Sequence, residues 1–277
     1  MARIIAPKLA ELVGQPVRIQ NISGAGGTVG AQALANATPD GYTLGMATVS
    51  TTGTGPVVRQ SIGYDPLEDF TPIIKVVDVP GVISVHPDFP AANFRQFIRV
   101  ISRNPGRFSY ASSGAGGVQH MGMELFKIRN RLYVVHIPYR GAGPALKDVV
   151  AGRIPIMWDN LSSSLPHINA GRLRPIGLVS DTRSKQVPDL PTFAELGVKN
   201  YHASTYFGVL APAGVDRRIV YSLSSALDYV IQDPEVSQAL IDAGSVPVGG
   251  SPAVLRNQII HELGKWGEVA RYTKVRI

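Results

Sequence analysis

Two copies of the pentapeptide Ser-Gly-Ala-Gly-Gly, at Ser23–Gly27 and Ser113–Gly117, are the residues best suited to bind a charged group. Each copy lies between a short apolar run and a segment with helical spacing. Glycines ahead of a helix leave backbone N–H groups free at an end with partial positive charge, which suits a carboxylate or a phosphate. Ser112, Ser113 and His120 add side-chain donors, so the second copy is the stronger candidate. A tight strand-to-helix turn without a ligand explains each copy alone equally well.

The glycine spacing does not fit the common nucleotide-binding loops. In the first copy, Gly24, Gly26 and Gly30 are one residue off the pattern G-x-G-x-x-G. Asp40 comes too early to be the acidic residue that follows such a motif. The second copy lacks the third glycine and the Lys-Ser/Thr pair of a P-loop. We therefore expect no nucleotide cofactor.

The sequence lacks the familiar catalytic and metal-binding patterns. It has no G-x-S-x-G motif, no H-E-x-x-H arrangement among its 6 histidines, and 0 cysteines. Asp159 follows the apolar run Ile154–Trp158, at the carboxyl end of an expected parallel strand, where open α/β sheets bind ligands. A lone carboxylate suits a ligand ammonium or hydroxyl better than acid–base catalysis, and it can also cap the next helix. We predict a binding protein with no metal and no cofactor, rather than an enzyme.

Alternating helix and strand patterns predict an α/β fold. The amino-terminal part has helical spacing at 3–12 and 28–37, and strand patterns at 16–21, 42–49, 73–77 and 82–85. A second alternating series covers 93–179, and a strand follows at 205–211. From residue 216 the chain is helical except for one short strand, so this part cannot build its own sheet and is expected to pack on the first lobe. A middle lobe would then be inserted, with crossings near 87–94 and 201–207.

Composition and charge narrow the possible partners. The 277 residues, 44% of them hydrophobic, can bury the cores of two lobes. The formal net charge of +7 favours anionic partners, but the basic residues are dispersed, so we expect no nucleic-acid partner. No apolar run is long enough to span a bilayer, and the apolar stretch after Met1 is too short for a signal peptide.

A block at residues 136–180 resembles the most characteristic segment of the periplasmic solute-binding proteins of tripartite tricarboxylate transporters, the Bug or TctC-like family. Shorter motifs similar to that family occur in the same order, at Pro39–Tyr42, Pro188–Thr192, Gly208–Gly214 and Gly249–Pro252. The resemblance extends from about Arg3 to the last helical segment. Chance produces such an ordered set far less often than any single motif.

The resemblance implies a two-lobed periplasmic-binding-protein-like fold of type II, in which each lobe is a mostly parallel sheet flanked by helices. Lobe 1 would comprise 1–93 and 207–277, and lobe 2 would comprise 94–206. The resemblance implies that the protein is a monomeric periplasmic receptor, which binds a small carboxylate or amino acid and delivers it to a membrane permease. A ligand sensor that signals to a membrane partner is the alternative. A carboxylate-processing enzyme with Asp159 or His120 as base is a further one.

The resemblance also implies which residues hold the ligand. In that family, loops of both lobes bind the carboxylate through backbone N–H and hydroxyl groups. The matching positions here are Thr48, Ser50, Ser112, Ser113, Gly114, Ala115, Gly116, Tyr139, Arg140 and Asp159, with Thr205 as a weaker choice. Asp159 would bind the amino group of an amino-acid ligand.

One departure from the family concerns the beginning of lobe 1. Family members have a strand and a Gly-rich loop before their first helix, whereas this chain opens inside that helix at Arg3. We expect that strand to be central to lobe 1 and its loop to supply part of the carboxylate site, so the implied lobe 1 lacks its amino-terminal strand.

Overall fold

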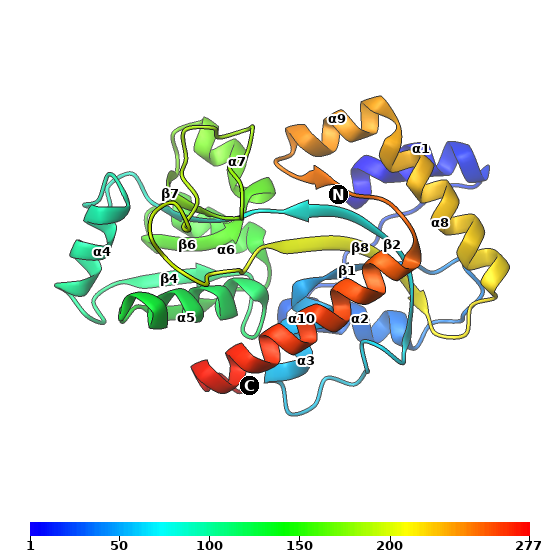
Figure 1. Ribbon diagram of the computed structural model, residues 1–277, viewed down its shortest axis with the longest axis horizontal. Coiled ribbons are helices and arrows are strands. Elements are labelled where there is room, and N and C mark those ends of the chain that lie inside the picture. The colour runs from blue at the N-terminus through cyan, green and yellow to red at the C-terminus, as the bar shows by residue number, and fades with distance from the viewer.

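The computed structural model describes residues 1–277 and shows two α/β lobes side by side (Figure 1). The first sheet has four strands in the order β1-β8-β2-β9. Their bounds are β1 Gly45–Thr48, β2 Phe70–Val79, β8 Thr205–Pro212 and β9 Val246–Pro247. The long strands β2 and β8 lie side by side and lead from this sheet toward the other lobe (Figure 1). The predicted two-lobed α/β class is confirmed.

The second sheet has five strands in the order β5-β4-β6-β3-β7. The strands are β3 Gly81–Val85, β4 Ser109–Ser112, β5 Val135–Pro138, β6 Ile156–Asn160 and β7 Arg174–Val179. Strand β4 pairs in parallel with β5 and β6, whereas β3 is antiparallel to both of its neighbours, β6 and β7. Four of the five strands therefore point the same way, with β3 reversed among them.

The first sheet differs from the mostly parallel sheet that was expected. Strand β8 pairs antiparallel with β1 and β2, and β9 pairs antiparallel with β2. Strands β1 and β2 point the same way, but β8 returns from the second lobe and lies between them. The two strands that point the same way, β1 and β2, are therefore separated by β8, which runs in the opposite direction.

The chain first crosses between the sheets at Pro80, earlier than the expected 87–94. Strand β2 ends at Val79 in the first sheet and β3 begins at Gly81 in the second. Proline has no N–H to donate to a ladder, which suits the residue where one long extended segment changes sheets. The chain returns through residues 180–204, between β7 and β8.

Helices cover both faces of the first sheet. One face packs against α1, α8 and α9, which share a core cluster that includes Leu9, Leu227 and Leu240. The other face packs against α2, α3 and α10, which contribute Leu34, Val58 and others to the largest cluster. The bounds are α1 Ala2–Val13, α2 Thr28–Ala35, α3 Gly55–Val58, α8 Arg217–Gln232, α9 Pro234–Asp242 and α10 Pro252–Thr273. The carboxyl-terminal helices thus complete the first lobe.

The second sheet is also covered on two sides. Helices α4 and α5 share the largest core cluster with Tyr201, Ala203 and Tyr206 of the returning segment, while α6 and α7 belong to two smaller clusters. The bounds are α4 Phe94–Ser102, α5 Val118–Asn130, α6 Ala142–Val150 and α7 Leu161–Asn169. Strand β6 alternates between these sides, because Trp158 packs with the largest cluster and Met157 with the cluster of α6. Ser113, which follows β4, and Asn160, the last residue of β6, line a cavity at the boundary between the lobes.

Candidate functional site

The two Gly-rich turns meet at the boundary between the lobes. The first forms a 3₁₀ turn, η1 (Ala25–Gly27), ahead of α2, and the second leads from β4 into α5. A Cβ atom built on Gly114 would lie 3.0 Å from the backbone N of Gly26. A side chain at Gly114 would push the backbones of the two lobes apart, so glycine is required here by close approach as well as by its φ of 153°.

A cavity of about 1690 Å³ extends from this boundary along the first lobe. That volume exceeds the ~300–1,000 Å³ typical of a small-molecule site, so the cavity is best treated as two parts. The interlobe cleft is the part lined by both lobes. From the first lobe and β8 it is lined by Ser23, Gly24, Gly26, Gly27, Thr48, Ser50 and Thr205, and from the second by Ser113, Gln119, residues 140–144, Asn160 and Ser163.

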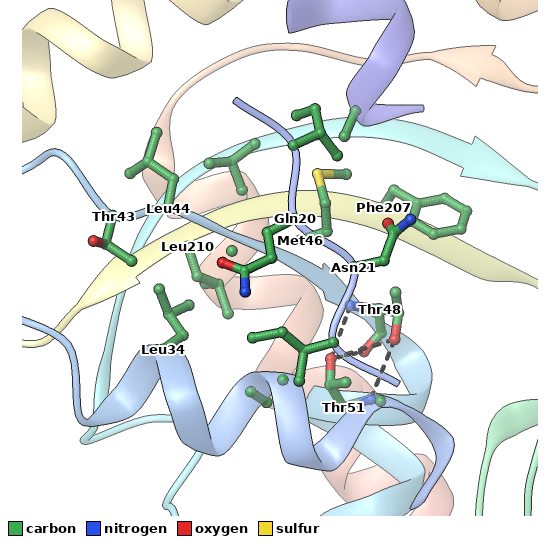
Figure 2. Close-up of a pocket in the computed structure, with 18 of the residues that line it drawn as sticks. Gln20, Asn21, Leu34, Thr43, Leu44, Met46, Thr48, Thr51, Phe207 and Leu210 are labelled. Carbon is green, nitrogen blue, oxygen red and sulfur yellow. Dashed lines mark hydrogen bonds between the residues drawn. The ribbon is translucent and has the colours of Figure 1, made fainter. Parts of the chain in front are cut away.

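The second part is a groove beside strand β1, lined by the first lobe alone (Figure 2). Strand β1 pairs with β8 on one side, and its other edge faces the groove, whose apolar floor includes Leu34, Met46 and Leu210. Residues 15–23 form the opposite wall and make no hydrogen bonds. The strand predicted at 16–21 is not formed. The groove separates residues 15–23 from the free edge of β1, so they have no strand to pair with.

Five of the predicted ligand residues line the cavity. They come from both lobes and are Thr48, Ser50, Ser113, Arg140 and Thr205, the last of which is the first residue of β8. Thr48 is held by Thr51, whose hydroxyl accepts from the Thr48 N–H at 3.0 Å, as Figure 2 shows. Arg140 is exposed and makes no hydrogen bond or ion pair, so its guanidinium is free for an anion.

Ser112 and His120 are among the predicted residues that the structure places behind the cleft. Ser112 is fully buried, and its hydroxyl lies 2.6 Å from Nε2 of His136. The rings of His120 and His136 stack with centroids 3.9 Å apart. Burial lowers the pKa of His120 to about 4. The N–H of Gly116 donates to Nδ1 of His120 at 3.1 Å, so a neutral imidazole supports the second turn from behind.

Four further predicted residues, Gly114, Ala115, Gly116 and Tyr139, do not line the cavity. The backbone of Gly114 and Gly116 packs against the first lobe, and the carbonyl of Ala115 accepts a hydrogen bond from Arg59. The hydroxyl of Tyr139 donates to Asp148 at 2.7 Å, and that bond keeps the ring on the side of α6. The neighbouring Arg140, rather than Tyr139, therefore faces the cleft.

Asp159 lies one layer behind the cleft and acts on it through Gln119. Its carboxylate accepts from Nε2 of Gln119 at 2.6 Å and from the hydroxyl of Ser164 at 3.0 Å. Oε1 of Gln119 in turn accepts from the N–H of Ser113 at 2.5 Å. Burial raises the pKa of Asp159 to about 7. The carboxylate thus orients the side chain and the turn that face a ligand.

Residues that sequence reasoning did not select also line the cleft. Gln119, Gly141, Asn160 and Ser163 come from the second lobe, and Ser23 from the first turn. Each lies within four residues of a selected position or in the first pentapeptide, which was the only available signal. Oδ1 of Asn160 is buried without a hydrogen-bond partner. An unpaired buried acceptor beside a cleft suits a donor from a ligand or from water.

The electrostatics of the cavity favour an anion. Asp40, in the turn before β1, is the single acidic residue of its lining, against Arg18, Arg140 and Arg218. No group of three or more metal-ligating side chains comes together anywhere in the chain. None of the helices combines the length and apolar character needed to cross a bilayer. The interlobe cleft therefore offers hydroxyls, amides and the free guanidinium of Arg140 to a ligand.

Comparisons with known proteins agree with this chemistry. A profile described as the tripartite tricarboxylate transporter family receptor matches residues 1–274. BugT of Bordetella pertussis is 35% identical over 278 residues, covering 100% of this chain and 85% of BugT. Two solved structures cover 99% of this chain and 92% of their own. They are a periplasmic transporter with 39% identity and a TM-score of 0.97, and an R. palustris protein with adipate, with 33% identity and a TM-score of 0.96.

Proposed function

This chain belongs to the tripartite tricarboxylate transporter receptor family, whose members are binding receptors rather than enzymes, and we propose that it binds a small dicarboxylate. The ligand lies in the interlobe cleft, and the protein delivers it in the periplasm to a membrane permease. The observation that carries this proposal is the lining of the cleft, which has the free guanidinium of Arg140 and no acidic side chain. The adipate present in one similar structure supports the same ligand class.

Each lobe has groups suited to a carboxylate. In the second lobe these are Arg140 and the N–H groups that follow Gly141 at the start of α6. In the first lobe they are the hydroxyls of Ser23 and Thr48 and the Gly-rich turn. A ligand with one carboxylate for each lobe can therefore bridge the cleft, which favours a dicarboxylate over a monocarboxylate.

Asn160 and Asp159 influence which substituents a bound ligand can carry. The unpaired Oδ1 of Asn160 suits a hydroxyl or amino group on the ligand. Both oxygens of Asp159 already accept hydrogen bonds, so its effect on an amino-acid ligand passes through Gln119 rather than through direct contact with an ammonium group. We therefore propose that hydroxy-dicarboxylates and amino-dicarboxylates are distinguished mainly at Asn160.

Isothermal titration with adipate, succinate and hexanoate tests the proposal. Adipate or succinate should bind, and hexanoate, which has one carboxylate, should bind at least about 10-fold more weakly, since each charge-assisted bond contributes about 1.5–3 kcal/mol. Arg140→Met should lower the affinity about 10-fold or more. Arg172→Met is the matched control, because Arg172 is an exposed arginine of the same lobe outside the cavity. Absence of binding to every dicarboxylate tested would refute the proposal.

For the groove beside β1 we propose a role in the fold rather than in ligand binding. Its two walls are the free edge of β1 and residues 15–23, which have unpaired backbone groups, and its floor is apolar. These are the features of a sheet edge that accepts a further extended strand. Such a strand would extend the first sheet and would order the loop that leads to Ser23.

A further inference from the structure

Arg59 connects the two Gly-rich turns across the boundary between the lobes. It follows helix α3 in the first lobe, and its Nη2 donates to two backbone carbonyls. One is that of Ala25 in the first turn, at 3.0 Å, and the other is that of Ala115 in the second turn, at 2.5 Å. A single guanidinium nitrogen therefore joins one lobe to the other at the point where the two Gly-rich turns meet.

We infer that Arg59 is a latch that stabilises the arrangement in which the two lobes are in contact, and that it raises ligand affinity without touching the ligand. The second part of this inference rests on the proposed function. The hydrogen bond to Ala115 exists only while the lobes meet, so it favours the closed arrangement over an open one. Arg59 is accordingly a positioning residue, since it does not line the cavity.

The surroundings of Arg59 explain why its charge is directed at the two turns. Arg59 forms no ion pair, and its Nε is buried without a partner. A guanidinium removed from water needs acceptors. The carbonyls of Ala25 and Ala115 accept from the same nitrogen, and a lysine ammonium, on a shorter and more flexible side chain, would reproduce these two bonds only in part.

The carboxyl terminus fixes the latch in the first lobe. The N–H of Ile277 donates to the carbonyl of Val58 at 2.8 Å, and the N–H of Gln60 donates to the carbonyl of Ile277 at 3.2 Å. The residues on both sides of Arg59 are thus tied to the end of the chain. Only the side chain of Arg59 has to reach across to the second lobe.

A second contact joins the lobes beside the latch. The hydroxyl of Ser50 accepts from the N–H of Val118 at 3.0 Å, at the first residue of α5. Because Ser50 also lines the cleft, its replacement would disturb the proposed ligand site directly. Arg59 is the better residue for a test, since it can be changed without altering the lining.

The experiment measures lobe closure by pulsed electron spin resonance on the full chain. The sequence has no cysteine, so Tyr221→Cys on α8 and Lys147→Cys on α6 introduce a unique pair of nitroxide labels at exposed sites of opposite lobes outside the cavity lining. The distance distribution is recorded with and without adipate for the parent, Arg59→Met and Arg59→Lys. Arg217→Met is the matched control, an exposed arginine on α8 without hydrogen bonds.

We expect Arg59→Met to shift the distribution toward longer distances and to weaken adipate binding about 10-fold, mainly through faster dissociation. Arg59→Lys should lie between this variant and the parent, which provides a measurement even if Arg59→Met folds poorly. Arg217→Met should match the parent. If both Arg59 variants keep the parent's distances and dissociation rate, the latch is refuted. If adipate fails to bind even the parent, the proposed function fails. The latch is then tested by comparing the ligand-free distance distributions of the parent and the Arg59 variants.

Discussion

The stacked histidines behind the second turn predict how stability depends on pH. Burial lowers the pKa of His120 to about 4 and that of His136 to about 3. Histidine in an unfolded chain titrates near 6.5. Between pH 6.5 and 4 the unfolded state therefore binds more protons than the folded state, and the free energy of unfolding falls as the pH falls. The positive charge of Lys127 on α5 acts in the same direction as burial.

The size of the effect follows from linkage. Between pH 7.5 and pH 5 the free energy of unfolding falls by about 2 kcal/mol through His120, because this histidine takes up a proton in the unfolded chain but not in the folded one. His136 is partly exposed, so solvent screening reduces its share to about 1 kcal/mol. The two histidines together should remove about 3 kcal/mol from the free energy of unfolding over this range.

Asp159 opposes the histidines in the same range of pH. Its pKa is raised to about 7 by burial, above the ordinary value of 3.8. Between these values the folded state binds more protons, so the free energy of unfolding rises as the pH falls, by about 2 kcal/mol between pH 7.5 and pH 5. The unmodified protein should therefore lose about 1 kcal/mol, because the two effects nearly cancel.

Urea unfolding at pH 7.5 and pH 5 tests this balance in three variants. Asp159→Asn removes the opposing group, so its free energy of unfolding should fall by about 3 kcal/mol from pH 7.5 to pH 5. That of His120→Gln should rise by about 1 kcal/mol over the same range. His261→Gln, at an exposed histidine of α10, is the matched control and should follow the unmodified protein. The reasoning is refuted if Asp159→Asn and His120→Gln show the same pH dependence as the control.

Three further predictions follow from the geometry of the site and the groove. Gly114→Ala should lower the free energy of unfolding by about 1–3 kcal/mol and weaken adipate binding, as measured by calorimetry. The control Gly264→Ala, on α10 with open space around it and outside the cavity lining, should lower neither the free energy of unfolding nor the affinity. Tyr139→Phe removes the hydrogen bond to Asp148 and should cost about 1 kcal/mol in thermal unfolding without changing ligand affinity, and a clear loss of affinity would show that Tyr139 faces the ligand. Amide exchange should be fast at residues 15–23, and protection comparable with that of β8 would contradict their lack of hydrogen bonds.

Much of the fold could be predicted from hydrophobic periodicity and helix boundaries. The start of α9 at Pro234 is an example, because Asp233 accepts from the N–H groups of Glu235 and Val236 as a capping residue does. Strand direction in the first sheet could not be predicted in this way. A strand pattern does not show that β8 returns from the other lobe and inserts between β1 and β2.

For the candidate site, the two Gly-rich turns and the resemblance to known receptors could be identified from the sequence alone. Glycine is needed at these turns because the backbone takes positive φ there, for example 75° at Gly116, and that requirement is local. Which of the neighbouring residues face the cleft follows from the folded arrangement. A side chain's direction depends on its place on a helix or strand, so Gln119 lines the cavity and His120, the next residue, is buried behind it. Arg59 carried no signal in the sequence, because the turns that it joins are 34 and 56 residues away along the chain and meet only in the folded protein.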